Sequence, residues 1–333
     1  MRVFVTGTAG FIGFHLARLL LSDGHQVAGF DGMTDYYDVR LKECRHAMLR
    51  QNAGFSATEA MLEDAEALNT AVAVFAPDVI VHLAAQAGVR YSLENPRAYI
   101  DANVTGTLNV MEAARAAGVR HLLMASTSSV YGANEDMPFA ETQKADTQLT
   151  IYAATKKANE SMGHAWAHVH GLPVTMFRFF TVYGPWGRPD MAHFKFTRGI
   201  IEGTPIDIYN NGEMWRDFTY VDDLVCAIRG LIDAVPGGPE TAVEGDSLSP
   251  AAPFRVVNIG NSEKVRLLDF IDAIEAAVGQ KAIRNMMPMQ RGDVTATWAD
   301  ATLLQRLTGY RPETPFREGV RRFVRWYRDY YSL

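Results

Sequence analysis

The stretch Arg2-Val-Phe-Val-Thr-Gly7-Thr-Ala-Gly10-Phe-Ile-Gly13 decides the fold of this chain. Its first five residues predict a β-strand, and the apolar stripe of Phe11–Ser22 predicts a helix that follows the turn directly. Glycines allow a tight turn and let the backbone approach a pyrophosphate, to which the helix N-terminus offers free N–H groups and a partial positive charge. We therefore predict a dinucleotide-binding turn rather than an ordinary strand–helix connection.

An acidic residue ends the next predicted strand, Gln26–Asp31. A carboxylate at this place accepts hydrogen bonds from the adenosine ribose hydroxyls and repels a 2′-phosphate. Asp31 therefore favours NAD over NADP as the cofactor. The glycine spacing is Gly-x-x-Gly-x-x-Gly, which differs from the Gly-x-Gly-x-x-Gly of many simple dehydrogenases.

Composition limits the class of protein. The chain has 333 residues, of which 48% are hydrophobic and 21% are charged, as expected for a globular protein with one large domain or a domain and a lobe. The formal net charge is −6 and no basic block occurs, so neither nucleic acid nor a membrane surface is an expected partner. No apolar run approaches about 18 residues and the chain opens directly on a strand, so we expect a cytoplasmic protein.

Few residues suit a disulfide or a metal. Two cysteines, Cys44 and Cys226, cannot form a disulfide framework or a four-cysteine zinc site, so we expect free thiols in a reducing compartment. His164 and His168 share a face of a predicted helix, but no acidic residue accompanies them. We therefore expect no metal.

Strands and helices alternate through the first half of the chain, which predicts an α/β fold of the Rossmann type with a doubly wound parallel sheet. The strands are apolar throughout, as strands buried on both faces should be. The expected strands are Arg2–Thr6, Gln26–Asp31, Asp78–Ala84, Arg120–Ser126 and Pro173–Phe179, and the expected helices are Phe11–Ser22, Ala65–Phe75, Pro96–Ala117 and Ile151–His170.

The second half is less regular. Residues 1–180 are expected to form the NAD-binding domain, to which segments around 210–260 return, and residues 181–333 mainly a smaller C-terminal α/β lobe for the substrate. Leu267–Val278 and Pro315–Tyr331 are predicted helices. Glycines and prolines in residues 235–253 predict an exposed, mobile loop.

Two polar segments are candidates for catalysis. Tyr152-Ala-Ala-Thr-Lys156 places a phenol and an ammonium four residues apart, on one face of a helix. A tyrosine of pKa ~10 is a poor base, and a nearby Lys⁺ together with a positive nicotinamide ring would lower that pKa. Ser126–Gly132 follows a buried strand, at the edge where doubly wound sheets bind ligands, and a hydroxyl there can share a proton with a substrate hydroxyl. Thr127, Tyr152 and Lys156 are therefore the predicted catalytic residues.

Over nearly its whole length, the chain resembles the extended short-chain dehydrogenase/reductases that act on nucleotide sugars. The motifs that carry the resemblance are Gly7-x-x-Gly10-x-x-Gly13, Asp31, His82-Leu-Ala-Ala85, Asn103-Val-Thr-Gly106-Thr, Ser126–Gly132, Tyr152-x-x-x-Lys156, Arg216-Asp-Phe-Thr-Tyr-Val-Asp222-Asp223, Asn258-Ile-Gly260-Asn and Gly292-Asp293. It implies NAD contacts from Gly7, Gly10, Phe11, Ile12, Gly13, Asp31, Leu62, Leu83, Ala84, Ala85, Gln86, Asn103, Ser126, Tyr152 and Lys156.

Within this family, three stretches resemble the 4-epimerases of UDP-glucuronate, namely Arg178–Ala192, Asp35-Tyr-Tyr-Asp38 and Ala87–Ser92. Dehydratases and decarboxylases of the group tend to have an acidic residue before Val-Tyr-Gly, whereas this chain has Ser129. The resemblance thus implies conversion of UDP-glucuronate to UDP-galacturonate through a transient 4-keto intermediate. A UDP-glucose 4-epimerase or a UDP-glucuronate decarboxylase is the alternative, and a non-catalytic NAD-binding protein would be expected to lack Tyr152 or Lys156.

The substrate carboxylate requires its own contacts, because a 4-keto uronic acid is a β-keto acid that loses CO₂ readily. We expect neutral hydrogen bonds to it from Thr127, Ser128, Ser129 and Thr181, with added charge from Arg90 or Arg188. The alternative role for Arg188 is to bind the nucleotide instead. The resemblance implies that Lys195, Arg216 and a residue near Arg291 hold the diphosphate and uridine, and arginine forks suit phosphate oxygens.

Two positions depart from the family pattern. Met61 stands where related epimerases have an aspartate that contacts adenine, which puts NAD retention in question, and Arg291 stands where proline is common. The predicted helices 96–117 and 151–170 carry apolar side chains beyond one core face, and the family pairs them across a two-fold axis. We therefore expect a homodimer.

Overall fold

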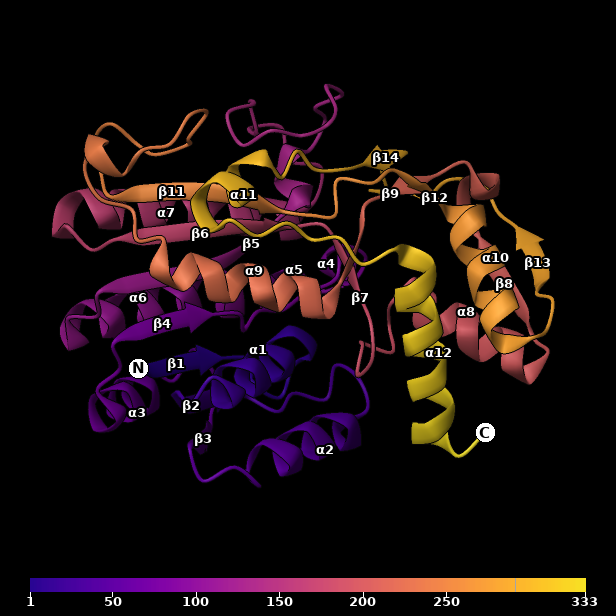
Figure 1. The fold of residues 1–333 in the computed structure, drawn as a ribbon, viewed down its shortest axis with the longest axis horizontal. Coiled ribbons are helices and arrows are strands. Elements are labelled where there is room, and N and C mark those ends of the chain that lie inside the picture. Colours follow the sequence, from indigo (N-terminus) through magenta and orange to yellow (C-terminus); the bar gives the residue numbers. More distant parts are fainter. Residues whose placement is uncertain (291) are drawn as a thin grey trace.

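A computed structural model of the chain describes residues 1–290 and 292–333. Its centre is a seven-stranded parallel sheet in the order β11-β6-β5-β4-β1-β2-β3 (Figure 1). The strands are β1 (Arg2–Thr6), β2 (Gln26–Asp31), β3 (Phe55–Glu59), β4 (Val79–His82), β5 (His121–Thr127), β6 (Val174–Phe179) and β11 (Phe254–Ile259). The chain reverses its direction across the sheet between β1 and β4, and the carboxyl ends of strands at such a point form the ligand crevice of doubly wound folds.

Helices cover both faces of this sheet, which confirms the predicted doubly wound architecture (Figure 1). One face carries α1 (Phe11–Ser22), α9 (Val221–Asp233) and α11 (Thr302–Thr308), and the other carries α3 (Ala65–Phe75), α6 (Gly106–Ala117) and α7 (Ile151–His170). Leucine, isoleucine and valine side chains of these helices fill two apolar cores, one on each face. The cores bury the sheet and leave its carboxyl edge to carry the site.

The predicted helix Pro96–Ala117 is broken into three pieces. A short helix α5 (Pro96–Tyr99) leads into a π-helical turn over Ile100–Thr105, and α6 follows. A π-helical turn shifts the side chains that follow it around the axis and is frequent near functional sites. Asn103 lies in this turn and is fully buried.

Helix α2 (Val39–Leu49) is an element that sequence periodicity does not reveal. Its buried side chains are Leu41, Lys42, Arg45, His46 and Leu49, so most of the face that packs against the protein is polar. An apolar stripe is the signal by which amphipathic helices are recognised, and α2 has no such stripe. Its N-terminus is nevertheless capped, since the Asp38 side chain accepts a hydrogen bond from the Arg40 N–H.

A smaller lobe lies beside the sheet and has an aromatic core (Figure 1). It contains α8 (Ala192–Glu202), α10 (Leu267–Val278) and α12 (Phe316–Tyr331), with the strand pair β8 (Pro205–Ile208) and β13 (Ile283–Met286). Short strands join it to the main body, namely β7 (Thr181–Tyr183), β9 (Trp215–Arg216), β10 (Phe218–Tyr220), β12 (Val265–Arg266) and β14 (Ala296–Thr297).

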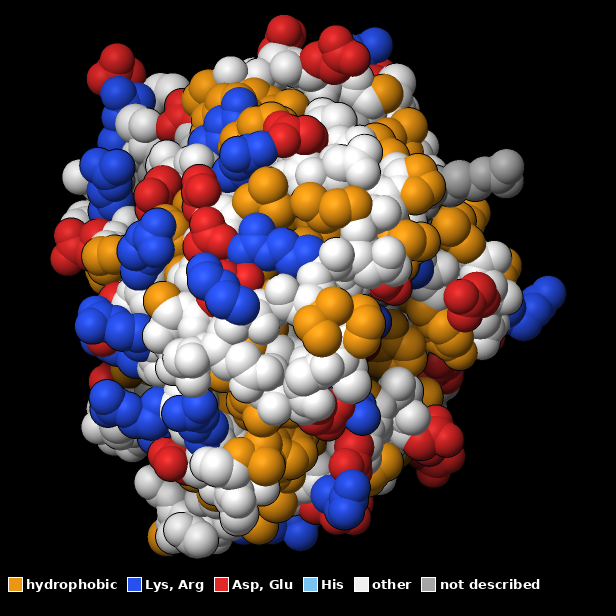
Figure 2. Space-filling model, turned by 90° about the vertical axis from the view of Figure 1, so that its right-hand side faces the viewer, with side chains coloured by type: hydrophobic (Ala, Val, Ile, Leu, Met, Phe, Trp, Pro, Cys, Tyr) orange, Lys and Arg blue, Asp and Glu red, His pale blue; other side chains and the backbone are white. Residues whose placement is uncertain are grey.

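Basic and acidic side chains are intermingled on the outer face of this lobe (Figure 2). On α12, for example, Glu318 forms ion pairs with Arg321 and Arg322. None of the helices in the described ranges is long and apolar enough to span a bilayer. In the same ranges, no group of three or more His, Cys, Asp or Glu side chains is arranged to hold a metal ion.

The loop of residues 235–253 is better anchored than its composition suggests. Asp246 within it forms a bidentate ion pair with Arg255 on β11, and both side chains are buried. The expectation of an exposed loop fits most of these residues, which are exposed or partly exposed, but not the side chain of Asp246, because β11 places a buried guanidinium that requires a carboxylate partner.

Candidate active site

A cavity of about 740 Å³ opens at the carboxyl edge of the sheet and extends towards the smaller lobe. Its volume falls in the range typical of ligand sites, and its walls combine apolar surface with a few polar groups. The glycine turn after β1, the ends of β4, β5 and β6 and the segment 292–297 all contribute to its lining. The cavity thus lies at the reversal point of the sheet.

The glycine turn forms one end of the cavity through bare backbone. Gly7 has φ +82°, and a Cβ there would lie 2.9 Å from the backbone nitrogen of Ala84. A Cβ on Gly13 would lie 2.1 Å from the Gly7 carbonyl oxygen. A side chain at either position would collide with the protein's own backbone, so only glycine lets the turn close this tightly, and a turn of this kind after the first strand fits a dinucleotide.

Asp31 ties this turn to the end of β2. Its carboxylate accepts one hydrogen bond from the Ala9 N–H at 2.9 Å and another from the Met33 N–H at 2.9 Å. A carboxylate has about four acceptor positions, so two remain for ribose hydroxyls. The structure therefore places Asp31 where it can bind a ribose while it fixes the turn.

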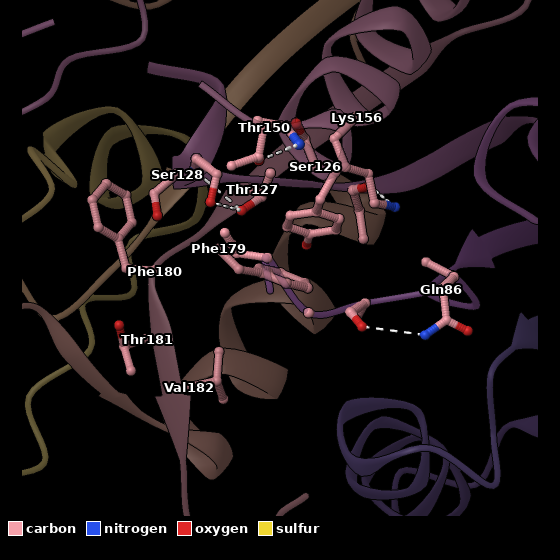
Figure 3. A pocket seen from close by; sticks show the side chains of 18 of the residues that line it. Gln86, Ser126, Thr127, Ser128, Thr150, Lys156, Phe179, Phe180, Thr181 and Val182 are labelled. Atoms are coloured by element: carbon pink, nitrogen blue, oxygen red, sulfur yellow. Dashed lines mark hydrogen bonds between the residues drawn. The ribbon is translucent and has the colours of Figure 1, made fainter. Parts of the chain in front are cut away.

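Asn103 supports the segment after β4 that forms one wall of the cavity. The Asn103 amide oxygen accepts a hydrogen bond from the Gln86 N–H at 2.8 Å, and its amide nitrogen donates to the Gln86 carbonyl at 3.0 Å. Asn103 thus lies outside the cavity lining and positions Gln86, which lines it (Figure 3). The predicted cofactor residues that do line the cavity are Gly7, Gly10, Phe11, Ile12, Gly13, Asp31, Leu62, Leu83, Ala84, Ala85, Gln86, Ser126, Tyr152 and Lys156.

Tyr152 and Lys156 project from the first turns of α7 beside the end of β5. The Lys156 ammonium donates to the Ala125 carbonyl at 3.0 Å, and burial lowers the pKa of Lys156 to about 8. Burial raises the pKa of Tyr152, against the opposing effects of the Thr127 hydroxyl and the positive charge of Arg188. Lys156, the cation that the sequence predicts to lower the pKa of this tyrosine, donates instead to strand β5, and Arg188 is the cation that opposes the effect of burial.

The hydroxyl groups at the end of β5 have two different roles. Ser126 donates to the carboxylate of Glu160 at 2.7 Å, so its hydroxyl serves the protein interior. Thr127 and Ser128 lie on one side of the cavity and Thr181 on another (Figure 3). The Thr127 hydroxyl accepts a hydrogen bond from the Ser129 N–H at 3.2 Å, which fixes it at the start of a short 3₁₀ turn. Three neutral hydroxyl groups thus surround one end of the cavity, next to Tyr152.

The structure places two of the predicted basic residues in the cavity lining and two others outside it. Arg188 and Arg216 line the cavity, whereas Arg90 is exposed and pairs with Asp293 at 3.4 Å, and Lys195 is exposed on α8. Arg291 lies outside the described residues.

The two arginines in the lining already have partners. Arg188 forms a bidentate ion pair with Asp190, at 3.0 and 2.5 Å. Arg216 donates to the carbonyl oxygens of Trp215 and Val294, both at 2.8 Å. A phosphate at this end would therefore compete with carbonyl oxygens for the Arg216 fork, and charge-assisted bonds to phosphate are the stronger ones.

Several lining residues escape sequence reasoning. Tyr36 and Tyr37 belong to the stretch that resembles uronate epimerases, but nothing in their spacing indicates a wall of the cavity. The α2 residues Lys42, Arg45 and His46 also escape it, because a helix without an apolar stripe is not recognised from periodicity and the burial of its polar side chains appears only in the structure. The lining residues that were missed include Thr34, Tyr36, Tyr37, Lys42, Glu63, Val89, Thr150, Phe179, Phe180, Val182 and Met191.

Comparison with known proteins places this geometry in a family. Residues 3–244 match the model of the NAD dependent epimerase/dehydratase family. This chain belongs to that family.

Relatives and solved structures agree with the family assignment. A probable UDP-glucuronate 4-epimerase of Rhizobium meliloti is 57% identical, over 99% of this chain and 98% of the relative. UDP-glucuronate 4-epimerase 1 of Arabidopsis thaliana is 44% identical, over 99% of this chain and 77% of the relative. The crystal structure of UDP-glucuronic acid 4-epimerase from Bacillus cereus, in complex with UDP-glucuronic acid and NAD, superposes with a TM-score of 0.89 at 29% identity, covering 99% of this chain and 100% of the other.

Proposed function

We propose that this chain is an NAD-dependent 4-epimerase that interconverts UDP-glucuronate and UDP-galacturonate. The observation that carries the proposal is the convergence of Tyr152, Lys156 and the hydroxyls of Thr127 and Ser128 at one end of a cavity whose other end is the glycine turn. The names of the full-length relatives in Rhizobium meliloti and Arabidopsis thaliana support the same activity.

The residues at the glycine turn fit NAD. Gly7, Gly10 and Gly13 would hold its pyrophosphate, and Asp31 its adenosine ribose. When bound, NAD supplies a reversible hydride acceptor, so no net oxidation of the sugar is needed. Because the hydride returns to the substrate, we propose that the cofactor stays in the protein between turnovers.

The protein residues handle the proton and the carboxylate. Tyr152 removes the proton of the C4 hydroxyl and later returns it, and Thr127 shares a hydrogen bond with the same oxygen. Lys156 keeps a positive charge next to α7 and β5, within the same buried end of the cavity. Ser128, Ser129 and Thr181 donate neutral hydrogen bonds to the C6 carboxylate and hold it in a geometry that resists loss of CO₂.

The basic residues and the chain segments have complementary roles in this proposal. Arg188 and Arg216 line the sugar-nucleotide end and hold the diphosphate. Residues 1–180 mainly hold NAD, and residues 181–333 mainly hold the sugar nucleotide. Arg90 and Lys195 lie outside the lining and would reach the ligand only by moving inward. Arg291 is proposed near the diphosphate on the resemblance alone.

Incubation with UDP-glucuronate, followed by NMR of the sugar anomeric protons, tests the function. UDP-galacturonate is the expected product, whereas UDP-xylose would identify a decarboxylase. Turnover of UDP-glucose alone would identify a UDP-glucose 4-epimerase, and no product from either sugar would contradict the enzymatic proposal. Tyr152→Phe should abolish product formation, with Tyr331→Phe on the exposed end of α12 as the matched control.

We also propose a homodimer, formed through the helical segments 96–117 and 151–170, that works in the cytoplasm. Ile100, Leu108 and Ile151 support the dimer, because these large apolar side chains are exposed on those segments. The free thiols Cys44 and Cys226 support a reducing compartment. Light scattering tests the dimer: Leu108→Asp should give monomers, and Val74→Asp, on the exposed face of α3 outside these segments, should not.

A further inference from the structure

Helix α2 buries a guanidinium that has only uncharged partners. Arg45 is 0% exposed. Its Nη1 donates to the Ala9 carbonyl at 2.7 Å and to the Tyr37 hydroxyl at 2.8 Å, while its Nη2 donates to the Trp186 carbonyl at 2.6 Å and to the Gly187 carbonyl at 3.2 Å. A buried charge without a carboxylate partner is costly. Stability alone therefore does not account for an arginine here.

One end of this arginine holds the cofactor turn. Ala9 lies between Gly7 and Gly10, its N–H donates to Asp31, and its carbonyl accepts from Arg45. The next residue on α2 acts on the same turn, because His46 Nε2 lies 3.0 Å from the Thr8 hydroxyl oxygen. Side chains of α2 thus form hydrogen bonds with two consecutive residues of the turn, Thr8 and Ala9, from outside the cavity.

The other terminal nitrogen of the Arg45 guanidinium binds a strained loop, residues 184–190. Trp186 has φ +59°, a conformation that a residue with a Cβ adopts only where its surroundings enforce it. Three successive carbonyls of this loop are fixed by side chains of α1 and α2: His15 Nε2 lies 2.9 Å from the Pro185 oxygen, and Arg45 binds those of Trp186 and Gly187.

This loop leads directly into the sugar-nucleotide end of the cavity. Arg188 follows Gly187 and lines the cavity, and Met191 lines it three residues later. If the Ala9 carbonyl moves, the rigid, planar guanidinium of Arg45 therefore transmits the movement to Trp186 and Gly187, next to Arg188. Arginine suits this task because its guanidinium keeps its donors in a fixed fork, which a lysine cannot reproduce.

We propose that Arg45 is a positioning residue that couples occupancy of the glycine turn to the conformation of loop 184–190, and thereby couples the binding of NAD to the binding of the nucleotide sugar. The proposal rests on the proposed function for the identity of the two ligands. Neither ligand touches Arg45, since its side chain is fully buried and absent from the cavity lining.

Equilibrium dialysis of the holoenzyme tests this coupling. The protein is dialysed against graded NAD concentrations, with and without saturating UDP, and the bound NAD is measured. Because coupling between two sites is reciprocal and commonly amounts to 5-fold or more, UDP should tighten NAD binding about 5-fold or more in the unaltered protein. In Arg45→Met and in Arg45→Lys, the effect of UDP should fall below about 2-fold, because neither side chain joins Ala9 to Trp186 and Gly187.

Arg50→Met is the matched control, because Arg50 directly follows the last residue of α2 and pairs with Glu59 at the surface. It should retain the full effect of UDP. A uniform loss of stability would weaken NAD binding equally with and without UDP, so the ratio separates coupling from structural damage. An unchanged ratio in Arg45→Lys, or the absence of any UDP effect in the unaltered protein, would overturn the proposal.

Hydrogen exchange keeps the test decisive if Arg45→Met fails to fold. In the unaltered protein, amides of residues 184–190 should exchange more slowly when NAD is added, and in Arg45→Lys this protection should disappear. Equal protection in both proteins would contradict the coupling. Failure of the proposed function is a separate outcome, because it appears as the absence of product from UDP-glucuronate.

Discussion

Glu160 of α7 and Arg178 of β6 form an ion pair inside the protein, with Arg178 Nε 2.8 Å from Glu160 Oε1 and both side chains only 3% exposed. The Ser126 hydroxyl at the end of β5 donates to the same carboxylate. Burial acts to raise the pKa of Glu160, but Arg178, Lys157 and Ser126 outweigh it and hold that pKa below its usual value. This pair therefore fastens the catalytic helix to β6 and, through Ser126, to β5, at whose end the hydroxyl cluster lies.

Glu160→Ala should lower the free energy of unfolding by about 3–5 kcal/mol, because it leaves the Arg178 guanidinium buried without a partner. Urea denaturation measures the loss. The double variant Glu160→Leu with Arg178→Met should recover most of it, since well-packed apolar residues replace buried ion pairs at little cost. A double variant as unstable as Glu160→Ala would contradict this account.

Lys156 gives the protein a stability that rises with pH in alkaline solution. Its pKa is lowered by burial to about 8 in the folded protein, below its value of about 10.4 in the unfolded chain. Between these values the unfolded chain binds the additional proton, so the free energy of unfolding should increase as the pH rises from 8 to 10.4, by up to roughly 3 kcal/mol. Lys156→Met should lack this increment.

Denaturation of both proteins at about pH 7.5, below this window, and at about pH 10, near its upper end, measures the difference. The exposed Lys144→Met serves as the control, because its ammonium pairs with Asp146 at the surface. Parallel pH profiles for Lys156→Met and the unaltered protein would show that burial does not lower the pKa of this lysine.

Met61→Asp should tighten NAD binding. Met61 lines the cavity and is 43% exposed, at the position where the family resemblance implies an aspartate that contacts adenine. One hydrogen bond of about 1 kcal/mol corresponds to roughly 5-fold in the dissociation constant. Met61→Leu, which adds no acceptor, should leave the constant unchanged, and an equal constant for Met61→Asp would exclude adenine recognition at this place.

Ser128→Ala combined with Ser129→Ala should weaken control of the uronate carboxylate. Both residues line the cavity next to Thr127. We expect epimerisation to slow about 10-fold or more and the share of turnovers that release CO₂ to rise, since two neutral donors are removed from the carboxylate. Trapping of labelled CO₂ from UDP-glucuronate measures the partition. If both rates stay unchanged, these serines do not hold the carboxylate.

Sequence periodicity predicted most of the scaffold. The strands Arg2–Thr6 and Gln26–Asp31 and the helices Phe11–Ser22 and Ile151–His170 have the bounds that were expected, because their apolar patterns are strong and their ends carry glycine or polar caps. The break in 96–117 was missed, since a π-helical turn keeps a helical residue composition while it changes the hydrogen-bond pattern.

The site was predictable where a motif has a defined place on the fold. Tyr152 and Thr127 follow from strand-end and helix-start motifs, and the structure brings them together. Lys195 and Arg90 were chosen by resemblance alone. The position of a charged residue on an exposed helix or loop does not reveal which way its side chain points. The hydrogen bonds of Arg216 to the backbone carbonyls of Trp215 and Val294 and the polar packing of α2 depend on tertiary contacts that one-dimensional patterns do not contain.

The packing of Trp186 gives the molecule an internal optical reporter. Its indole contacts Phe14 of α1 at a centroid distance of 5.6 Å and Trp326 of α12 at 5.4 Å. Two indoles this close couple their electronic transitions, so near-ultraviolet circular dichroism should record their mutual orientation. Spectroscopy without any added dye can therefore follow how the C-terminal helix sits against the cofactor helix during turnover.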